Sequence, residues 1–214
     1  MRSEKVFWAD PYLNELACSV TAVRDDAITV DQTIFFAFSG GQESDAGTIG
    51  GRIVLEARKE GQSIWYRLPT AHGLQAGDAV VMTIDAERRG RLMRLHFAAE
   101  LVLELMCQHY SPLTKVGAHI SADKARLDFL WDGSIAGAIV DIKPKLRELV
   151  VADLPIVSRF TDPARELRCW EVSGFASVAC GGTHPRRTGE VGVLRLKRNN
   201  IGKGKERIEI TLAD

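Results

Sequence analysis

The spacing of hydrophobic positions changes along the chain at about Glu87. Before that residue, short runs of β-branched and aromatic residues are separated by glycine-rich turns, a pattern typical of strands joined by tight connections. Strands do not alternate with helices there, so the pattern argues against a Rossmann-type dinucleotide-binding fold. The strands predicted in this part of the chain cover residues 27–30, 33–38, 49–55, 63–68 and 79–84.

From Glu87 onward, apolar residues recur at steps of three and four, which predicts an amphipathic helix over residues 87–109. We place a domain boundary at the start of this helix, between a β-rich domain of residues 1–86 and a mixed domain of residues 87–214. The mixed domain is predicted to contain a strand pair at 116–120 and 126–130, a helix within 135–151, a strand at 167–172, and a hairpin of 191–197 with 207–212 whose turn lies in 199–204.

The composition is that of a folded protein. The chain has 214 residues, of which 45% are hydrophobic, enough for one large core or two small ones. Its longest apolar runs are far shorter than the roughly 18 residues of a membrane span, and the first residues do not resemble a secretory signal. We therefore expect a soluble, cytoplasmic protein with no membrane partner, either a monomer or a weak homo-oligomer. The four cysteines are too few and too widely spaced for a disulfide framework, so a functional cysteine would bind metal or react.

The formal net charge of zero, from 28 basic and 28 acidic residues, conceals a polarised chain. Residues 1–86 carry 7 basic and 12 acidic side chains, a net charge of −5, and residues 87–214 carry the remaining 21 and 16, a net charge of +5. Within the second part, residues 184–208 contain eight Lys or Arg and only Glu190 and Glu206 as acids. A local excess of positive charge is typical of a surface that binds a polyanion such as a nucleic acid.

Side chains with metal-binding atoms occur in two clusters. His96 and Glu100 are four residues apart in the predicted helix and therefore share one face. Cys180 and His184 are separated by small residues that allow a loop to fold tightly around an ion. These nitrogen, oxygen and sulfur donors suit zinc best among the common divalent metals. Either cluster alone also has an ordinary structural interpretation, because a helix histidine or a buried cysteine usually only packs in the core.

The same residues resemble a known family. Residues 94–100 are similar to the H-x-x-x-H helix in the editing domain of alanyl-tRNA synthetase and in its free-standing relatives, the AlaX proteins. Glu100 replaces the second histidine of that motif. Residues 180–184, which read C-G-G-T-H, and residues 188–192, which read T-G-E-V-G, match the family's C-G-G-T-H and T-G-x-I/V-G segments.

Two further segments extend the resemblance over most of the chain. Residues 117–129 resemble the family's pocket-lining strand pair, and residues 39–49 resemble a G-G-G-Q-x-x-D-x-G-T-I segment of synthetases and two-domain AlaX proteins, with Ser39 in place of its first glycine. The resemblance implies an α+β fold in which residues 1–86 form a small β-barrel-like domain. Residues 87–214 would then form an α/β sandwich with an antiparallel sheet and helices, of the threonyl/alanyl-tRNA synthetase editing type.

The resemblance also implies an activity. The family hydrolyses the ester that joins a wrong amino acid, serine or sometimes glycine, to tRNA for alanine. A second, hydrolytic test is useful because a small pocket cannot strongly reject a substrate that merely adds a hydroxyl. Zinc can activate a water molecule and polarise the ester carbonyl. We therefore expect a zinc-dependent trans-editing deacylase whose partner is the acceptor end of mischarged tRNA(Ala). No nucleotide-phosphate loop occurs in the sequence, so ligase activity is not expected.

Roles for individual residues follow from the resemblance. His96, Glu100, Cys180 and His184 would bind zinc, but Glu100 could instead be the general base that activates water beside three protein ligands. We favour the ligand, because the family has one at that position. Gln42, Thr48 and His119 are candidates for contacting the serine hydroxyl of the substrate. Thr183 is a further candidate at the substrate site, where its hydroxyl could orient His184 or merely fill space.

Basic residues flank both ligand clusters in sequence and are candidates for binding tRNA phosphates. They are Arg88, Arg89, Arg91, Arg94, Arg186, Arg187, Lys197 and Arg198, and Lys203, Lys205 and Arg207 would extend the surface along the C-terminal hairpin. Any one of them alone is more often an ordinary solvated residue. Two other functions stay open: a zinc-stabilised RNA-binding module without hydrolytic activity, and a metallohydrolase that acts on another acyl substrate.

Overall fold

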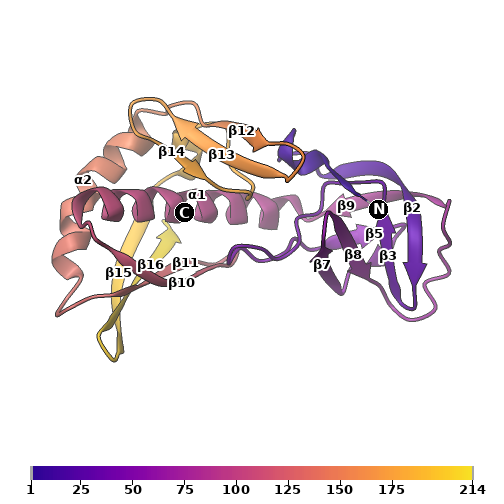
Figure 1. The fold of residues 1–214 in the computed structure, drawn as a ribbon, viewed down its shortest axis with the longest axis horizontal. Coiled ribbons are helices and arrows are strands. Elements are labelled where there is room, and N and C mark those ends of the chain that lie inside the picture. The colour runs from indigo at the N-terminus through magenta and orange to yellow at the C-terminus, as the bar shows by residue number, and fades with distance from the viewer. Residues whose placement is uncertain (1, 214) are drawn as a thin grey trace. The chain divides into compact units, whose positions relative to one another are not determined.

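The computed structural model describes residues 2–213, which separate into two compact units (Figure 1). Unit 1 is formed by the chain up to Ser39 together with Glu43–Gly90, and unit 2 by Gly40–Gln42 together with the chain from Arg91 onward. The described residues form two α-helices and largely antiparallel sheets, which confirms a mixed α+β class.

Unit 1 is built on a seven-stranded sheet of order β6-β5-β9-β2-β3-β8-β7, in which all neighbours are antiparallel. Its core contains the fully buried side chains of Phe35, Tyr66 and Met82. The barrel-like form of this domain stays a prediction. The elements of unit 1 are β1 (Glu4–Lys5), η1 (Val6–Trp8), β2 (Glu15–Arg24), β3 (Ala27–Val30), β4 (Gln32–Thr33), β5 (Gly47–Ile49), β6 (Arg52–Ile53), β7 (Glu56–Glu60), β8 (Ser63–Arg67) and β9 (Ala79–Ile84).

The predicted strand at residues 33–38 is wrong. β4 ends at Thr33, and residues 34–37 are buried without strand pairing, whereas Phe38 is exposed. Their backbone is satisfied by side chains instead: the N–H of Phe36 donates to Asp45 Oδ2 at 2.6 Å, and Arg89 Nη2 donates to the carbonyl of Ile34 at 2.5 Å. An apolar run therefore marked burial here, but not strand geometry.

The predicted strand at residues 49–55 is also wrong as a single element. Gly50 and Gly51 have φ angles of +55° and +76°, in the left-handed region, and form the turn between β5 and β6. Glycine adopts this region without steric cost, so the two residues reverse the chain within what reads as one apolar run. By contrast, the strand predicted at residues 79–84 is confirmed as β9.

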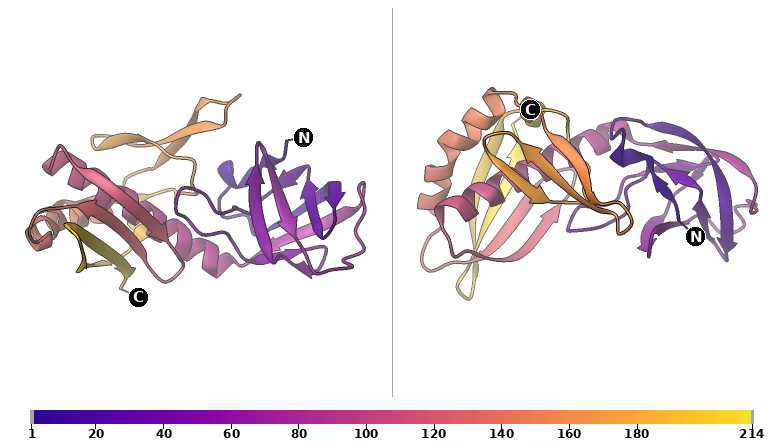
Figure 2. Two further views of the ribbon diagram at one scale, coloured as in Figure 1. Left: turned by 60° about the horizontal axis from the view of Figure 1, so that its bottom comes forward. Right: turned by 45° about the horizontal axis from the view of Figure 1, so that its top comes forward.

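Unit 2 contains two sheets on opposite sides of α1 (Figures 1 and 2). The four-stranded sheet has the order β10-β11-β16-β15, and the three-stranded sheet has the order β12-β13-β14. No helix of the described residues is long and apolar enough to cross a membrane. The elements are α1 (Ala86–His109), which begins in unit 1, then β10 (Thr114–Ile120), β11 (Ala125–Leu130), α2 (Ala136–Val151), β12 (Val157–Asp162), β13 (Leu167–Val172), β14 (Ala176–Ala179), η2 (Thr188–Val191), β15 (Leu194–Gly202) and β16 (Lys205–Leu212).

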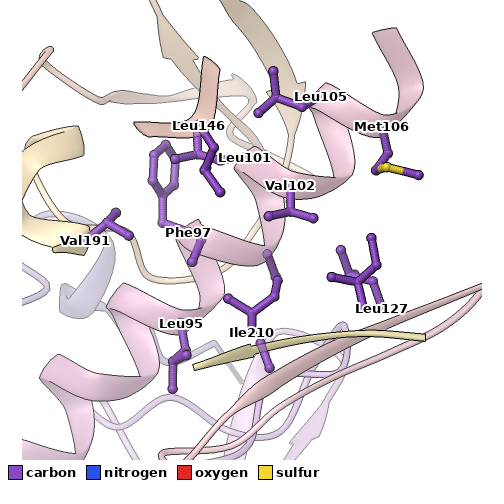
Figure 3. Packing of buried hydrophobic residues seen from close by; sticks show 14 of the residues in the cluster. Leu95, Phe97, Leu101, Val102, Leu105, Met106, Leu127, Leu146, Val191 and Ile210 are labelled. Carbon is purple, nitrogen blue, oxygen red and sulfur yellow. The ribbon is translucent and has the colours of Figure 1, made fainter. Parts of the chain in front are cut away.

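Helix α1 is the centre of unit 2. Its existence and span are confirmed, but the predicted amphipathic character is wrong, because from Leu92 onward residues on every side of the helix are buried. Leu127 and Ile210 of the four-stranded sheet lie on one side of it, whereas Leu146 of α2 and Val191 lie on the other (Figure 3). A helix packed between two layers needs apolar residues all round. A polar side chain in the buried stretch of α1, such as His96, therefore needs partners within the fold.

The C-terminal hairpin is confirmed with a shorter turn than predicted. Pairing between β15 and β16 continues to Gly202 and Lys205. The remaining residues, Lys203 and Gly204, have φ angles of +57° and +68°. Two central residues with positive φ match the tight connection that best fits the twist of a hairpin.

Candidate metal centre

His96, Cys180 and His184 converge inside unit 2. The Sγ atom of Cys180 lies 3.2 Å from Nε2 of His96 and 3.3 Å from Nε2 of His184. All three donor atoms lie within 4.8 Å of one another. His96 is presented by α1, while the other two residues belong to the loop that follows β14. We call this set the His–Cys–His group.

The His–Cys–His group fits a zinc ion. Tetrahedral bonds of about 2.0–2.3 Å place neighbouring ligand atoms about 3.3–3.8 Å apart, close to the distances observed. Burial lowers the pKa of His96 and lowers that of His184 still further, so both imidazoles are neutral, the form that binds metals. Burial, with the nearby Glu100 charge, raises the pKa of the Cys180 thiol to about 12. A cation that binds this thiol must therefore displace its proton.

Glu100 lies beside the group. Its Oε1 is 3.7 Å from Nε2 of His96 and 3.8 Å from Sγ of Cys180, while its Oε2 accepts a hydrogen bond of 3.1 Å from Nε1 of Trp170. These distances suit a fourth tetrahedral ligand as well as a base next to a bound ion. Both interpretations of Glu100 from the sequence therefore remain proposals.

Gly182 is needed for the close approach of loop and helix. A Cβ atom at this position would lie 2.6 Å from both Cε1 and Nε2 of His96, and 3.2 Å from Oε1 of Gln42. Gly181, which precedes it, has no such neighbour within 4 Å. Of the two glycines in the motif, the second is therefore the one that the geometry requires.

Two residues that no sequence pattern singled out contact His184 and the loop that carries it. Ser158 Oγ lies 3.1 Å from Nδ1 of His184, and Nη1 of Arg168 donates to the carbonyl of Gly182 at 3.4 Å. Ser158 belongs to β12, an exposed strand that the hydrophobic pattern did not reveal. Arg168 and Trp170 lie in the predicted strand β13. The sequence pattern that could have identified them is two bulky residues on one face of a strand that precedes the Cys180–His184 loop.

Gln42 and Thr183 meet next to the His–Cys–His group. Gln42 is fully buried, and its Nε2 donates to Oγ1 of Thr183 at 3.1 Å. Its Oε1 has no hydrogen-bond partner among the described residues. The proposed contact between Thr183 and His184 is replaced by another: Ser158 occupies Nδ1 of His184, and Thr183 bonds to Gln42.

The other two predicted substrate residues lie elsewhere. His119 pairs with Arg126 across β10 and β11, so it shares the sheet face of Arg126, opposite to the buried row of Ala125 and Leu127. The core of unit 2 lies on that buried side, so His119 points away from it. Thr48 belongs to unit 1, where it pairs with Ile53 and Thr83 in the seven-stranded sheet. Its role stays a prediction.

Comparison with known proteins identifies the family. Residues 168–209 match the family described as the threonyl and alanyl tRNA synthetase second additional domain. The chain is 30% identical over 222 residues to the alanyl-tRNA editing protein AlaX-M of Pyrococcus horikoshii, and the match covers 98% of both chains. The chain belongs to the AlaX-M family. It is also 30% identical to the AlaX-M protein of Methanosarcina barkeri, over 99% of this chain and 100% of that one.

The same AlaX-M family chain is 31% identical to the alanine–tRNA ligase of Methanopyrus kandleri, over 99% of its own length but 26% of the ligase. It thus corresponds to about a quarter of that enzyme. The matched residues 168–209 include Cys180 and His184, whereas His96 and Glu100 lie outside them. The assignment of His96 to the metal-binding group therefore rests on the geometry rather than on the matched residues.

The basic side chains at the start of α1 donate hydrogen bonds to carboxylates and backbone carbonyls of the protein itself. Arg89 is 2% exposed and ion-paired with Asp45 in the core of unit 1, so it is unsuitable for binding tRNA phosphates and leaves the predicted set. Its guanidinium satisfies buried carbonyls instead. Side chains nearby make similar contacts: Arg88 with Glu43 and the Ser44 carbonyl, Arg91 with the Ala122 carbonyl, and Arg94 with the Val191 carbonyl.

The basic residues after the ligand loop are more accessible in this AlaX-M family chain. Arg186, Arg187, Lys197 and Arg198 are exposed. Arg187 pairs with Asp153 at 2.7 Å and both side chains are about half exposed, whereas Arg198 pairs at 2.5 Å with Glu206, whose side chain is 1% exposed. Exposed ion pairs contribute little stability, so Arg187 can exchange partners at low cost, but release of Arg198 would leave a buried carboxylate without its main donor.

Proposed function

We propose that this chain is a zinc-dependent trans-editing deacylase that hydrolyses the ester of mischarged tRNA(Ala), with serine as the preferred amino acid and glycine as the second. The observation that carries the proposal is the His–Cys–His group, with two buried imidazoles and a half-buried thiol, in a chain of the AlaX-M family. The names of the relatives, alanyl-tRNA editing proteins and alanine–tRNA ligases, support tRNA(Ala) as the partner.

His96, Cys180 and His184 would hold the zinc ion, with Glu100 as the fourth ligand. When bound, zinc supplies polarisation of an ester carbonyl and a lowered pKa for a water molecule. Ser158 and Arg168 keep His184 and the Gly182 carbonyl in place. These contacts reduce the freedom of the ligand loop, which is the usual task of residues behind metal ligands.

Gln42 is the strongest candidate for testing the amino acid. Its Nε2 is committed to Thr183, while its buried Oε1 lies next to Gly182 and lacks a donor among the described residues. A buried carbonyl without a donor is costly, and a serine hydroxyl or an α-ammonium group would satisfy it. Alanine and glycine carry the ammonium group but lack the hydroxyl, so only the contact with the hydroxyl would discriminate, and it would favour serine. Thr48 and His119 stay weaker candidates.

At the level of domains, we propose that residues 87–214 form the editing domain and that residues 1–86 form a barrel-like domain around the seven-stranded sheet. The motif containing Gln42 interrupts this division, because Gly40–Gln42 belongs to unit 2. The backbone N–H of Ile120 donates to the carbonyl of Gly41 at 2.8 Å, which joins the motif to the end of β10.

The direct test is deacylation of Ser-, Gly- and Ala-tRNA(Ala) by the purified chain. We expect rapid hydrolysis of the serine ester, slow hydrolysis of the alanine ester, loss of activity with a chelator and recovery when zinc is restored. Intact tRNA binding without turnover would support the RNA-binding module. Equal turnover of all three esters would exclude an editing specificity and favour a hydrolase with another acyl substrate.

Binding of tRNA is expected to depend on salt through the accessible basic residues. Replacing both Arg186 and Arg187 with alanine should reduce the slope of log K against log salt by about 1 to 2, because each lost phosphate contact removes about 0.9. Arg24→Ala is the matched control, since Arg24 is an exposed arginine paired with Glu60 in the acidic part of the chain. An unchanged slope in the double variant would remove these residues from the tRNA surface.

A further inference from the structure

Trp170 directs its one polar atom at Glu100. The side chain is fully buried in β13, and Nε1 donates to Oε2 of Glu100 at 3.1 Å. An indole N–H can only donate, and a buried one needs an acceptor. With Oε2 occupied in this way, Oε1 is the oxygen that lies 3.7–3.8 Å from the donor atoms of His96 and Cys180.

The indole ring is itself fixed by packing. Phe97 of α1 lies edge-on to Trp170 with a centroid distance of 5.1 Å, and Phe175 stacks on it at 6.4 Å. The indole of Trp170 therefore has little freedom to move with the Glu100 carboxylate if that group rotates. Glu100, by contrast, is 20% exposed and is an unbranched side chain that could exchange its two oxygens by rotation about its last bond.

Trp170 belongs to a row of residues that support the ligands. In the register of β12 and β13 it lies directly opposite Ser158, which contacts Nδ1 of His184. Two positions earlier on the same strand face, Arg168 contacts the Gly182 carbonyl. One face of this strand pair thus contacts two ligand side chains and the ligand loop.

We propose that Trp170 is a positioning residue that fixes Glu100 with one oxygen, Oε1, directed at the His–Cys–His group. The inference deepens the proposed function and rests on its metal site. Residues that hydrogen-bond to metal ligands orient them, and their removal typically weakens metal affinity about 10- to 100-fold. Trp170 would affect zinc affinity only through the Glu100 carboxylate. Its effect should therefore disappear when Glu100 is absent, whereas an effect due to packing alone would persist.

A double-mutant cycle on zinc affinity tests the dependence. Trp170→Phe removes the N–H and keeps an aromatic ring against Phe97, so the zinc dissociation constant, measured by chelator competition, should rise about 10- to 100-fold. In a Glu100→Ala background the same substitution should change it less than about threefold. Trp131→Phe is the matched control, because Trp131 packs edge-on against Tyr110 and should leave zinc affinity unchanged.

The outcomes are distinct. Equal losses in both backgrounds would mean that Trp170 only packs, and no loss in the native background would overturn the inference while leaving the metal site intact. If the native chain itself binds no zinc, the metal site of the proposed function fails instead.

A measurement on unaltered Trp170 guards against misfolding of the variant. The chain contains four tryptophans, so ¹⁵N-tryptophan labelling gives few indole N–H signals to assign. Glu100→Ala should shift the Trp170 indole signal upfield, because its acceptor is lost, and leave the Trp131 signal in place. An unmoved Trp170 signal would show that the hydrogen bond is not formed, and would overturn the inference.

Discussion

Gly182→Ala is expected to weaken zinc binding about 100-fold, the upper end for changes to groups that orient a metal ligand. The added Cβ would lie 2.6 Å from Nε2 of His96, the atom that faces Cys180. His96 cannot retreat easily, because its neighbours on α1 are buried on every side and close-packed cores relax only partially. Deacylation of Ser-tRNA(Ala) should fall by at least the same factor.

Gly181→Ala is the control for that substitution. It makes the same chemical change one residue earlier, where no neighbouring atom lies within 4 Å of the new Cβ. We expect zinc affinity, deacylation and melting temperature close to those of the native chain. If Gly182→Ala bound zinc as tightly as Gly181→Ala, the close packing of the loop against His96 would not describe the metal-bound protein.

The spacing of apolar residues correctly predicted those helices and strands in which the apolar positions are the ones that the fold buries. The spans of α1 and β13 and the strand pair β10–β11 follow from steps of three and four, or from alternation, in short windows. The same signal failed where apolar residues are buried for another reason. Residues 34–37 are buried outside any strand, with the Phe36 N–H bonded to Asp45 and the Ile34 carbonyl bonded to Arg89, and a contact of that kind between distant residues leaves no periodic trace.

The candidate site shows the same limit. Spacing and resemblance selected His96, Cys180 and His184, which the fold brings together. Neither signal could select Ser158, because its contribution depends on the register of an exposed strand against β13. Nor could charge alone show that Arg89 is buried: its role depends on Asp45, 44 residues away in sequence. Side chains that would bind the metal directly can be predicted from motifs. Residues that hold those side chains in place can be identified only from the tertiary structure.

Substitutions of Glu100 are expected to show that it binds the metal. Glu100→Gln replaces the carboxylate with a weaker neutral donor, so zinc affinity should fall about 10- to 100-fold, whereas Glu100→His should restore it by supplying an imidazole near the same corner. Activity should follow metal content in both variants. Chelator competition and deacylation of Ser-tRNA(Ala) at saturating zinc are the measurements.

The alternative predicts the opposite combination. If Glu100 is a general base, Glu100→Gln should retain its zinc and still lose about 10²- to 10⁴-fold in rate, because the lost proton acceptor acts only in the reaction. We expect the first result, because Oε2 is held by Trp170 and Oε1 is the oxygen presented to the group, 3.7 Å from Nε2 of His96 and 3.8 Å from Sγ of Cys180. The distances suit a base beside a bound ion as well, so the zinc content of Glu100→Gln, measured together with its rate, decides between the two roles.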